Sequence, residues 1–419
     1  MYNRHIMNPQ AIESANNAME TGDATLALSI LGADIQSSPT LETLAMRASI
    51  LTGQGHFDKA IDDYTQALNF TKKNDERAAI ILERGCVHKE DANDAAAFDD
   101  FNAAIELNPK SDAAHFERGL FFFEFGEHEK ARTDLEKSIS LNPKSSHPHT
   151  ILGRICLEEN QFADALAQFK KALAIDPSDP EAQLFIGQAY AYTGHPDDAI
   201  AAFKKTLERN PKNSLALYSL AGAHYAKGEI SDVIEICDRL LTTDPQDDSA
   251  YGMRGMALIV SGQYVRALKD LNAAINLDPY DGLYFANRGQ AYQSLGKFKE
   301  AMADYKKSLR LDNESEELYR NIGTLYIEMN LSKKALLALD KAVSLEPLFS
   351  EPYYYRGVAY EKIQRYEDAL QNYTHAIKLA PKKSIYYYAR ANLFKTLGQS
   401  EKAKSDLKKG NELNPNASR

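Results

Sequence analysis

The chain has 419 residues, a net charge of −10, three cysteines and no tryptophan. Its apolar runs are too short to span a membrane, and its N-terminal residues lack the hydrophobic core of a signal peptide. Three scattered cysteines cannot supply a disulfide framework. We therefore expect reduced thiols, a cytoplasmic location and no membrane partner.

Along the chain, a proline recurs with a period of 34 residues, which is typical of a stacked repeat array. The slots hold Pro109, Pro143, Pro177, Pro211, Pro245, Pro279, Pro347, Pro381 and Pro415, and Asn313 replaces one proline. Each unit has a small residue 24 positions before its proline, such as Gly119, and in most units another 12 positions before it, such as Ala131. Apolar residues between these marks follow helical spacing. Because proline cannot continue a helix, each unit is expected to form helix A, a turn, helix B and a stop.

The units differ in charge along the chain. We expect an N-terminal extension at 1–7, two divergent units at 8–77, five units of an acidic part at 78–247, and five units of a basic part at 248–417. Residues 1–250 hold 23 Lys and Arg against 40 Asp and Glu, whereas residues 251–419 hold 26 against 19. This asymmetry either steers partners of opposite charge to the two parts or reflects solvated helix faces.

Two units depart from the pattern. The unit at 214–247 does so at Ala221, His224, Val233 and Cys237, and we interpret it as an irregularity or a hinge in the stack. In the last unit, Asn411 occupies a position that is apolar in the preceding units. Because a terminal repeat needs a polar outer face, this unit is expected to be a polar terminal cap.

The repeat resembles the tetratricopeptide repeat (TPR) family. The resemblance is carried by Gly289, Tyr292, Gly296, Ala301 and Tyr305, together with the proline slots. The tryptophan slot of the family is filled by Tyr251, Phe285, Tyr319, Tyr353 and Tyr387, or by His115 and His149. About twelve units cover nearly the whole chain, with no other domain. The resemblance implies an all-α fold, an α-solenoid in which helix-turn-helix units stack into a right-handed superhelix.

Comparing the units with one another reveals a charge pairing. Where a unit has arginine one residue before the small position of helix A, it has aspartate or asparagine sixteen residues later. The pairs are Arg47 with Asp63, Arg84 with Asp100, Arg118 with Asp134, Arg254 with Asp270, Arg288 with Asp304, Arg356 with Asn372, and Arg390 with Asp406. An arginine fork suits a planar carboxylate, so we predict that these pairs join helix A to helix B.

No motif predicts catalysis or cofactor binding. His115 and His149 fill the aromatic packing slot, which favours a structural role over a metal site. No cysteine pair has the spacing of a zinc site. A nucleophile would also need a base and an oxyanion hole, and no insertion interrupts the repeats to hold them. We therefore expect a protein that is not an enzyme and that needs no metal or cofactor.

If the TPR resemblance holds, helix A lines a concave groove. Its outward positions carry side chains that we predict to contact a partner: Phe116, Leu120, Phe123, Tyr192, Tyr218, Tyr225, Met256, Asn287, Arg320, Asn321, Tyr354 and Tyr388. Exposed aromatic and methionine side chains suit peptide binding, although the same residues could pack against the next helix A. Asn287 and Asn321 could bind the backbone of an extended peptide, as the asparagine ladder does in the TPR part of the O-GlcNAc transferases.

These features favour a non-catalytic scaffold or adaptor that binds a peptide segment or a partner protein in its groove. The carboxylate clamp of chaperone adaptors is not expected, because no unit has lysine at its fifth position with asparagine at its ninth. Nucleic-acid binding is not expected either, since acidic residues interrupt the lysines of the basic part. The alternative is a self-assembling structural protein, a homo-oligomer in which the acidic part of one copy contacts the basic part of another.

Overall fold

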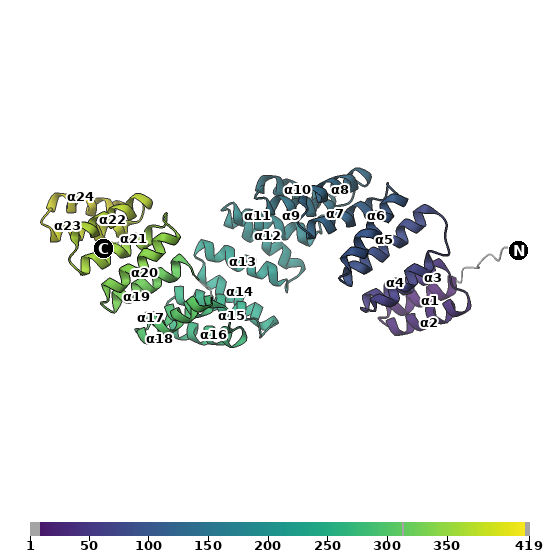
Figure 1. The fold of residues 1–419 in the computed structure, drawn as a ribbon, viewed down its shortest axis with the longest axis horizontal. Helices are drawn as coiled ribbons and strands as arrows, with labels where there is room; N and C mark the ends of the chain where they lie inside the picture. Colours follow the sequence, from purple (N-terminus) through teal and green to yellow (C-terminus); the bar gives the residue numbers. More distant parts are fainter. Residues whose placement is uncertain (1–8, 312–313, 415–419) are drawn as a thin grey trace. The chain divides into compact units, whose positions relative to one another are not determined.

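The computed structural model describes residues 9–311 and 314–414, which form 24 α-helices and no β-strand (Figure 1). The extension expected at 1–7, the Asn313 slot and Pro415 lie outside the described residues. The chain divides into two compact units, 1–211 and 212–419, which we call unit 1 and unit 2 and describe separately. The boundary precedes the divergent repeat at 214–247, whereas the change of charge follows it.

Unit 1 consists of six helix pairs. Its A helices are α1 (Pro9–Glu20), α3 (Leu41–Gly53), α5 (Asn74–Glu90), α7 (Asp112–Glu124), α9 (His147–Glu158) and α11 (Pro180–Tyr192). Its B helices are α2 (Ala24–Ser37), α4 (Phe57–Ala67), α6 (Asp94–Leu107), α8 (His128–Leu141), α10 (Phe162–Ile175) and α12 (Pro196–Arg209).

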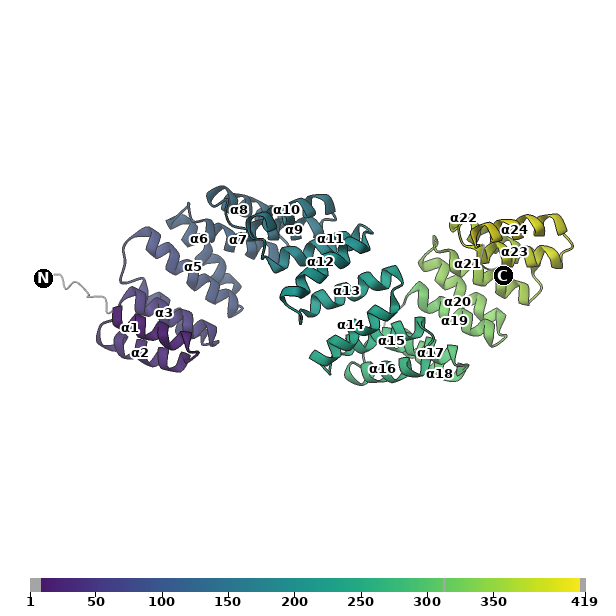
Figure 2. The ribbon, with the colours of Figure 1, turned by 180° about the vertical axis from the view of Figure 1, so that it is seen from behind.

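Unit 2 also consists of six pairs, which Figure 2 shows from behind. Its A helices are α13 (Ser214–Lys227), α15 (Asp248–Val260), α17 (Gly282–Ser294), α19 (Glu316–Glu328), α21 (Ser350–Lys362) and α23 (Ser384–Thr396). Its B helices are α14 (Ile230–Thr243), α16 (Tyr264–Leu277), α18 (Phe298–Arg310), α20 (Ser332–Leu345), α22 (Tyr366–Leu379) and α24 (Ser400–Leu413).

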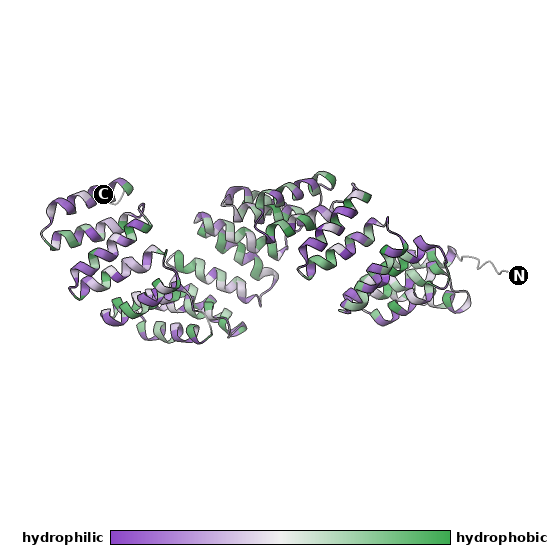
Figure 3. Cartoon of the chain, turned by 45° about the horizontal axis from the view of Figure 1, so that its top comes forward, coloured by the Kyte–Doolittle hydropathy of each residue, from purple (hydrophilic) through white to green (hydrophobic). Residues whose placement is uncertain are grey.

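The packing is that of an α-solenoid, as expected. Within each unit, helix A packs against helix B of its own repeat, and helix B packs against the next helix A. Successive A helices also contact one another, as α7, α9 and α11 do in unit 1 and α15, α17, α19 and α21 do in unit 2. The A helices therefore present a continuous face in each of these stretches. Polar and apolar residues occur together on the helices of both units (Figure 3).

Local chemistry explains where the helices begin and end. Asn142, Asp176, Asn210 and Asp278 are C-caps of B helices, and each immediately precedes a proline of the 34-residue period. Between helices A and B, glycine adopts a positive φ, as at Gly126 (φ 72°), because the turn needs a left-handed residue. In the next repeat Asn160 takes that conformation instead (φ 60°).

Small residues allow the two helices of a repeat to approach closely. A Cβ atom on Gly153 would lie 2.4 Å from a ring carbon of Phe169, which is too close for any side chain. Phe169 is fully buried, as are its counterparts Phe101, Leu135 and Phe203. No helix within residues 9–311 or 314–414 is both long and apolar enough to cross a membrane.

Candidate functional site

Six of the seven predicted arginine pairs are formed. In repeat 112–145, Arg118 donates from Nε to Asp134 Oδ2 (2.7 Å) and from Nη2 to Asp134 Oδ1 (2.9 Å). The same two-bond contact joins Arg47 to Asp63, Arg84 to Asp100, Arg254 to Asp270, Arg288 to Asp304, and Arg390 to Asp406. The aspartates are almost completely buried, so these pairs hold helix A on helix B.

The seventh prediction, a contact between Arg356 and Asn372, is wrong. Arg356 Nε lies 3.2 Å from Asp340 Oδ1 in the preceding helix B, while Asn372 donates its amide to the Asp368 carbonyl (2.8 Å). A neutral amide offers one acceptor oxygen and no charge, so it cannot compete with a carboxylate for the guanidinium.

The arginines also contact the preceding repeat, which the sequence did not lead us to expect. Arg118 Nη1 donates to Asn102 Oδ1 (2.7 Å), and Arg288 Nη1 donates to Asn272 Oδ1 (2.7 Å). Equivalent contacts join Arg84 to Thr65, Arg254 to Asp238, and Arg390 to Thr374. Each of these arginines therefore links three helices, and its donors are used within the scaffold.

A sequence signal for this third contact exists. The acceptor lies two residues after the position that holds the paired aspartate. Where the next repeat carries the arginine, this position is Thr65, Asn102, Asp238, Asn272, Asp340 or Thr374, except before Arg47, where it is Gly32. Where the next repeat lacks the arginine, the position is Glu136, Lys170, Lys204 or Lys306. Short acceptor side chains thus accompany the arginine of the following repeat.

The outward side of α5, α7, α9 and α11 forms the most distinctive surface, which we call the α5–α11 face. Its main residues are Glu83, Cys86, Lys89, Phe116, Glu117, Leu120, Glu124, Ile151, Arg154, Phe185 and Tyr192. Phe116 and Leu120 are half-buried against the core formed by Phe123, Ile151 and Ile155. The floor of the face is therefore apolar.

Arg154 lies between two aromatic rings on this face. Its guanidinium carbon is 4.7 Å from the ring centroid of Phe123 on α7 and 5.1 Å from that of Phe185 on α11. Such cation–π contacts contribute about 0.5–1 kcal/mol each at exposed sites. The stack connects three successive A helices.

A pocket of about 370 Å³ adjoins the stack. It is lined by Arg154, Leu157, Glu158, Asn160, Phe162, Phe185, Gln188 and Tyr192. The ring of Tyr192 stacks on Phe162 with centroids 5.8 Å apart, yet Tyr192 remains 69% exposed. Aromatic walls with a few polar groups are the usual chemistry of a pocket that receives a side chain.

Carboxylates border the other end of the α5–α11 face. Burial raises the pKa of the Glu83 carboxyl. Burial is also the main cause of the raised pKa of Glu117; nearby Lys89 opposes it, and Glu83 and Glu124 add to it. Lys89 Nζ contacts Glu124 Oε1 (2.8 Å), whereas no lysine, arginine or histidine among the described residues forms an ion pair with Glu83 or Glu117.

Burial, followed by the charges of Glu117 and Glu83, raises the pKa of the Cys86 thiol, which lies near these two carboxylates. A raised pKa favours the thiol over the thiolate, which is the nucleophilic form.

In unit 2, the charged and phenolic groups of the A helices contact one another. Arg320 Nε lies 3.4 Å from Glu316 Oε1 and 3.5 Å from Glu351 Oε2, and Lys383 Nζ lies 2.6 Å from Glu351 Oε1. Tyr218 donates its hydroxyl to Asp247, and Tyr388 donates to Asn411 Oδ1 (3.0 Å). The Tyr354 ring packs on Tyr355, Tyr373 and Tyr386.

The predicted contact residues differ in exposure. Tyr192 and Tyr225 are exposed, and the half-buried ones are Phe116, Leu120, Tyr218, Met256, Asn287, Arg320, Tyr354 and Tyr388. Phe123 and Asn321 are only 6% and 7% exposed, so we correct their assignment to packing residues. Phe123 packs among Leu135 of α8 and Ile151 and Ile155 of α9, and the repeat position alone does not reveal the burial of either residue. Phe123 still presents its ring to Arg154.

The residues that the sequence reading did not single out are Glu83, Glu117, Arg154 and Phe185. Glu83, Glu117 and Phe185 occupy the sixth position of their repeats, and Arg154 the ninth. Reading these positions for charge as well as for aromatic content could have found them.

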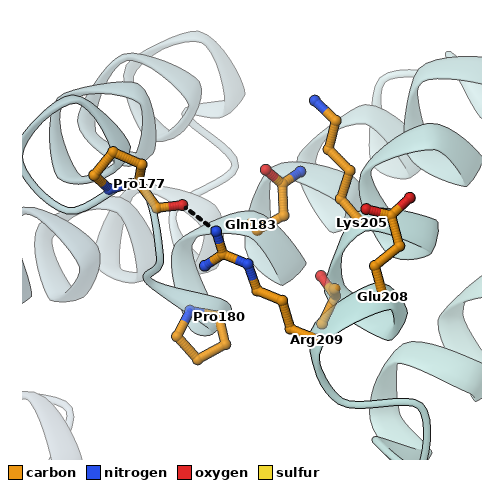
Figure 4. A pocket seen from close by; sticks show the side chains of 7 residues that line it. Pro177, Pro180, Gln183, Lys205, Glu208 and Arg209 are labelled. Atoms are coloured by element: carbon orange, nitrogen blue, oxygen red, sulfur yellow. Dashed lines mark hydrogen bonds between the residues drawn. The ribbon is translucent and has the colours of Figure 1, made fainter.

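Another pocket, of about 270 Å³, lies between the loop after α10 and the end of α12 (Figure 4). Arg209 reaches across it and donates from Nη2 to the Pro177 carbonyl (2.9 Å). Asp179 accepts the backbone N–H groups of Glu181 and Ala182 at the start of α11. Because the arginine and the helix N-terminus are both occupied by the protein itself, this pocket is a joint between repeats.

One group of side chains in the described residues has metal-ligand chemistry: ligand atoms of His224, Glu229 and Asp232 lie within 4.8 Å of one another. The Glu229 carboxylate is already shared by His224 Nδ1 (2.6 Å) and Lys227 Nζ (2.6 Å). A metal ion would have to replace both contacts, so we interpret the group as an ion-pair network.

Comparisons with known proteins agree with this geometry. Family models described as tetratricopeptide repeat or TPR repeat match residues 41–74, 82–146, 153–194, 184–248, 289–330, 316–347, 350–383 and 385–417. No curated protein matches the chain.

Two crystal structures show the fold. The APC/C hetero-tetramer Cut9–Hcn1 is similar with 16% identity and a TM-score of 0.54, over 99% of this chain and 94% of that chain. A tetratricopeptide repeat protein from Parabacteroides merdae is similar with 20% identity and a TM-score of 0.51, over 60% of this chain and 99% of that chain. With its helix pairs, its 34-residue period and family matches over most of its length, the chain belongs to the tetratricopeptide repeat family.

Proposed function

We propose that this protein is a non-catalytic interaction scaffold and that the α5–α11 face is its principal binding surface for a peptide segment of a partner. The observation that carries the proposal is the Phe123–Arg154–Phe185 stack beside the pocket with the exposed Tyr192. The family assignment supports an interaction role. The similar Cut9–Hcn1 structure is itself that of a hetero-tetramer.

The exposed aromatic surface at Tyr192 favours the binding of a partner side chain. Tyr192 keeps most of its ring in water although a pocket opens next to it. Filling that pocket would remove apolar area from water, and buried aromatic anchors supply most of the free energy at protein interfaces. Because the Arg154 stack holds Phe185 in place before binding, little ordering entropy would be lost there.

The A helices of unit 2 offer a weaker case. Tyr225, Met256 and Asn287 stay accessible, and we keep them as contacts of a secondary surface. Arg320, Tyr218 and Tyr388 are engaged with neighbouring side chains, so a ligand would have to replace existing contacts. The backbone-binding asparagine ladder also loses support, because Asn321 is buried.

The test uses the full-length chain and a phage library of random dodecapeptides. Peptides selected on the wild type are labelled, and their affinities are measured by fluorescence anisotropy. We expect Phe185→Ala/Tyr192→Ala to weaken binding at least about ten-fold, in line with the loss of an aromatic anchor. Tyr280→Ala, which removes an exposed tyrosine from the loop between α16 and α17, is the matched control and should bind as the wild type does.

Circular dichroism confirms that each variant is folded. Equal affinities for the wild type and the double variant would contradict the proposed site. A library that yields no binding peptide would contradict the proposed function itself.

Self-association is the second candidate function. Residues 1–211 hold 20 Lys and Arg against 33 Asp and Glu, whereas residues 212–419 hold 29 against 26. Opposite net charges could bring unit 1 of one copy against unit 2 of another. Light scattering at low and high salt tests this: a salt-sensitive oligomer favours self-association, and a monomer at both salt concentrations favours the scaffold.

A further inference from the structure

We infer that the segment bound on the α5–α11 face is basic, with a lysine or arginine side chain seated between Glu83 and Glu117 and apolar side chains over Phe116 and Leu120. This inference rests on the proposed function and names the chemistry of its partner.

The α5–α11 face carries more acidic than basic side chains. At the outward positions of its four helices, the acidic side chains are Glu83, Glu90, Glu117, Glu124, Glu158 and Glu181, and the basic ones are Lys89 and Arg154, with His147 also near Glu117. Both cations are already engaged, Lys89 with Glu124 and Arg154 with two aromatic rings. A ligand therefore meets a surface with an excess of negative charge, which attracts a cationic segment and repels an acidic one.

The scaffold arginines next to these glutamates in the sequence point away from them. Arg84 and Arg118 directly follow Glu83 and Glu117 in the sequence, and a charge count alone would pair them. The structure directs both guanidinium groups to the other side, onto Asp100 and Asp134. The two glutamates are thus left without a cation because their sequence neighbours hold the repeats together.

Glu83 and Glu117 occupy the sixth position of successive repeats, on α5 and α7, and the charge of Glu83 adds to the raised pKa of Glu117, so the two carboxylates repel each other. Two like charges on a partly desolvated surface destabilise the free protein. A cation of the ligand placed between them would remove this repulsion. This gain in binding free energy requires a positive group, so a neutral side chain of similar size does not obtain it.

An apolar surface lies beside the two carboxylates. Phe116 and Leu120 lie on the same helix as Glu117, and the aromatic pocket at Tyr192 lies further along the face. A purely polar ligand would leave these groups in water. The complementary segment therefore combines a basic residue with apolar ones.

The experiment extends the library selection to a charge variant of the full chain. On the wild type, we expect lysine and arginine to be enriched among selected dodecapeptides. On Glu83→Gln/Glu117→Gln, the enrichment of basic residues should disappear while the enrichment of apolar residues remains. The control Glu235→Gln/Glu300→Gln removes the same net charge from exposed positions on B helices and should behave as the wild type does.

A double-mutant cycle locates the contact. Replacing the basic residue of the best peptide by glutamine should weaken its binding to the wild type on the order of ten-fold. The same replacement should change its binding to Glu83→Gln/Glu117→Gln by less than about two-fold, because the partner charges are gone. Independent, additive effects would overturn the inference.

The outcomes separate the two proposals. If Phe185→Ala/Tyr192→Ala abolishes binding but the selected peptides show no basic bias, the charge inference fails and the proposed function stands. If no peptide depends on Phe185 and Tyr192, both fail. A salt-sensitive dimer that Glu83→Gln/Glu117→Gln abolishes would assign the face to a second copy and overturn the inference.

Discussion

The A helices of the two units carry different side chains at the same repeat position. The sixth position holds Glu83 and Glu117 in unit 1, and Asn287 and Asn321 in unit 2. The scaffold beneath is the same, since Arg118 binds Asp134 in unit 1 as Arg288 binds Asp304 in unit 2. The fold therefore leaves the chemistry of the A-helix face free to vary.

The two faces also differ in how their charges are satisfied. In unit 2, Arg320 and Lys383 lie against Glu316 and Glu351. In unit 1, Glu83 and Glu117 have no such partner. A surface whose carboxylates lie within ion-pair distance of its own cations gains less from a cationic ligand than one with unpaired carboxylates, even though Arg320 Nε and Glu316 Oε1 make no hydrogen bond. This contrast is why we place the principal binding surface in unit 1.

The largest expected effect concerns the shared scaffold. Asp304→Ala leaves the Arg288 guanidinium partly buried without its carboxylate and should lower the free energy of unfolding by about 3–5 kcal/mol. The double variant Asp304→Ala/Arg288→Leu should lose less of the free energy of unfolding, because it no longer buries an unpaired guanidinium group. Denaturation of both variants is the measurement, and equal transition midpoints would contradict the ion-pair account. Asp63→Ala in unit 1, which removes the carboxylate bound by Arg47, should behave like Asp304→Ala.

A smaller effect is expected for the contact between repeats. Asn272→Ala removes the acceptor for Arg288 Nη1 and should cost about 0.5–1.5 kcal/mol. Lys306 occupies the equivalent position in a repeat whose successor has Ile322 in place of the scaffold arginine. Lys306→Ala should therefore change the free energy of unfolding by less than about 0.5 kcal/mol. Chemical denaturation compares the two, and a larger cost for Lys306→Ala would refute the three-helix contact.

The smallest effect concerns pH. Glu83 and Glu117 have raised pKa values in the folded chain, so the folded state binds their protons more tightly than the unfolded state does. When they are ionised, the two glutamates lower the free energy of unfolding. This destabilisation disappears as the pH falls through the raised pKa values towards the ordinary value of 4.5.

Glu83→Gln/Glu117→Gln should therefore be more stable than the wild type at pH 7, by less than about 1 kcal/mol. The difference should shrink as the pH falls through the raised pKa values of the two glutamates towards 4.5. Nearby Lys89, Glu124 and His147 are present in both proteins, so the comparison isolates the two glutamates. Denaturation at several pH values measures the difference, and one that grows at low pH would show that the carboxylates stabilise the fold.

Much of the fold follows from repeat register alone. The proline period predicts the ends of the B helices, and the arginine register predicts six contacts because the helix pair repeats the same local geometry. Arg356 departs from the prediction because Asp340 of the preceding repeat competes with the neutral Asn372. That competition depends on helices brought together by stacking.

The binding surface is less predictable. Aromatic content identified Tyr192, but repeat position could not show that Phe123 and Asn321 are covered by neighbours. The unpaired state of Glu83 is also hidden in the sequence, because Arg84 stands next to it and its direction is set by Asp100 and Thr65. Burial and side-chain direction are tertiary properties, and both are needed to define the site.

Hydrogen–deuterium exchange of the full chain with and without a selected dodecapeptide tests the central claim most directly. Binding on the α5–α11 face predicts slower exchange in α5, α7, α9 and α11, with α17, α19 and α21 unchanged. The protection should disappear in Phe185→Ala/Tyr192→Ala. Protection confined to the A helices of unit 2 would contradict the account.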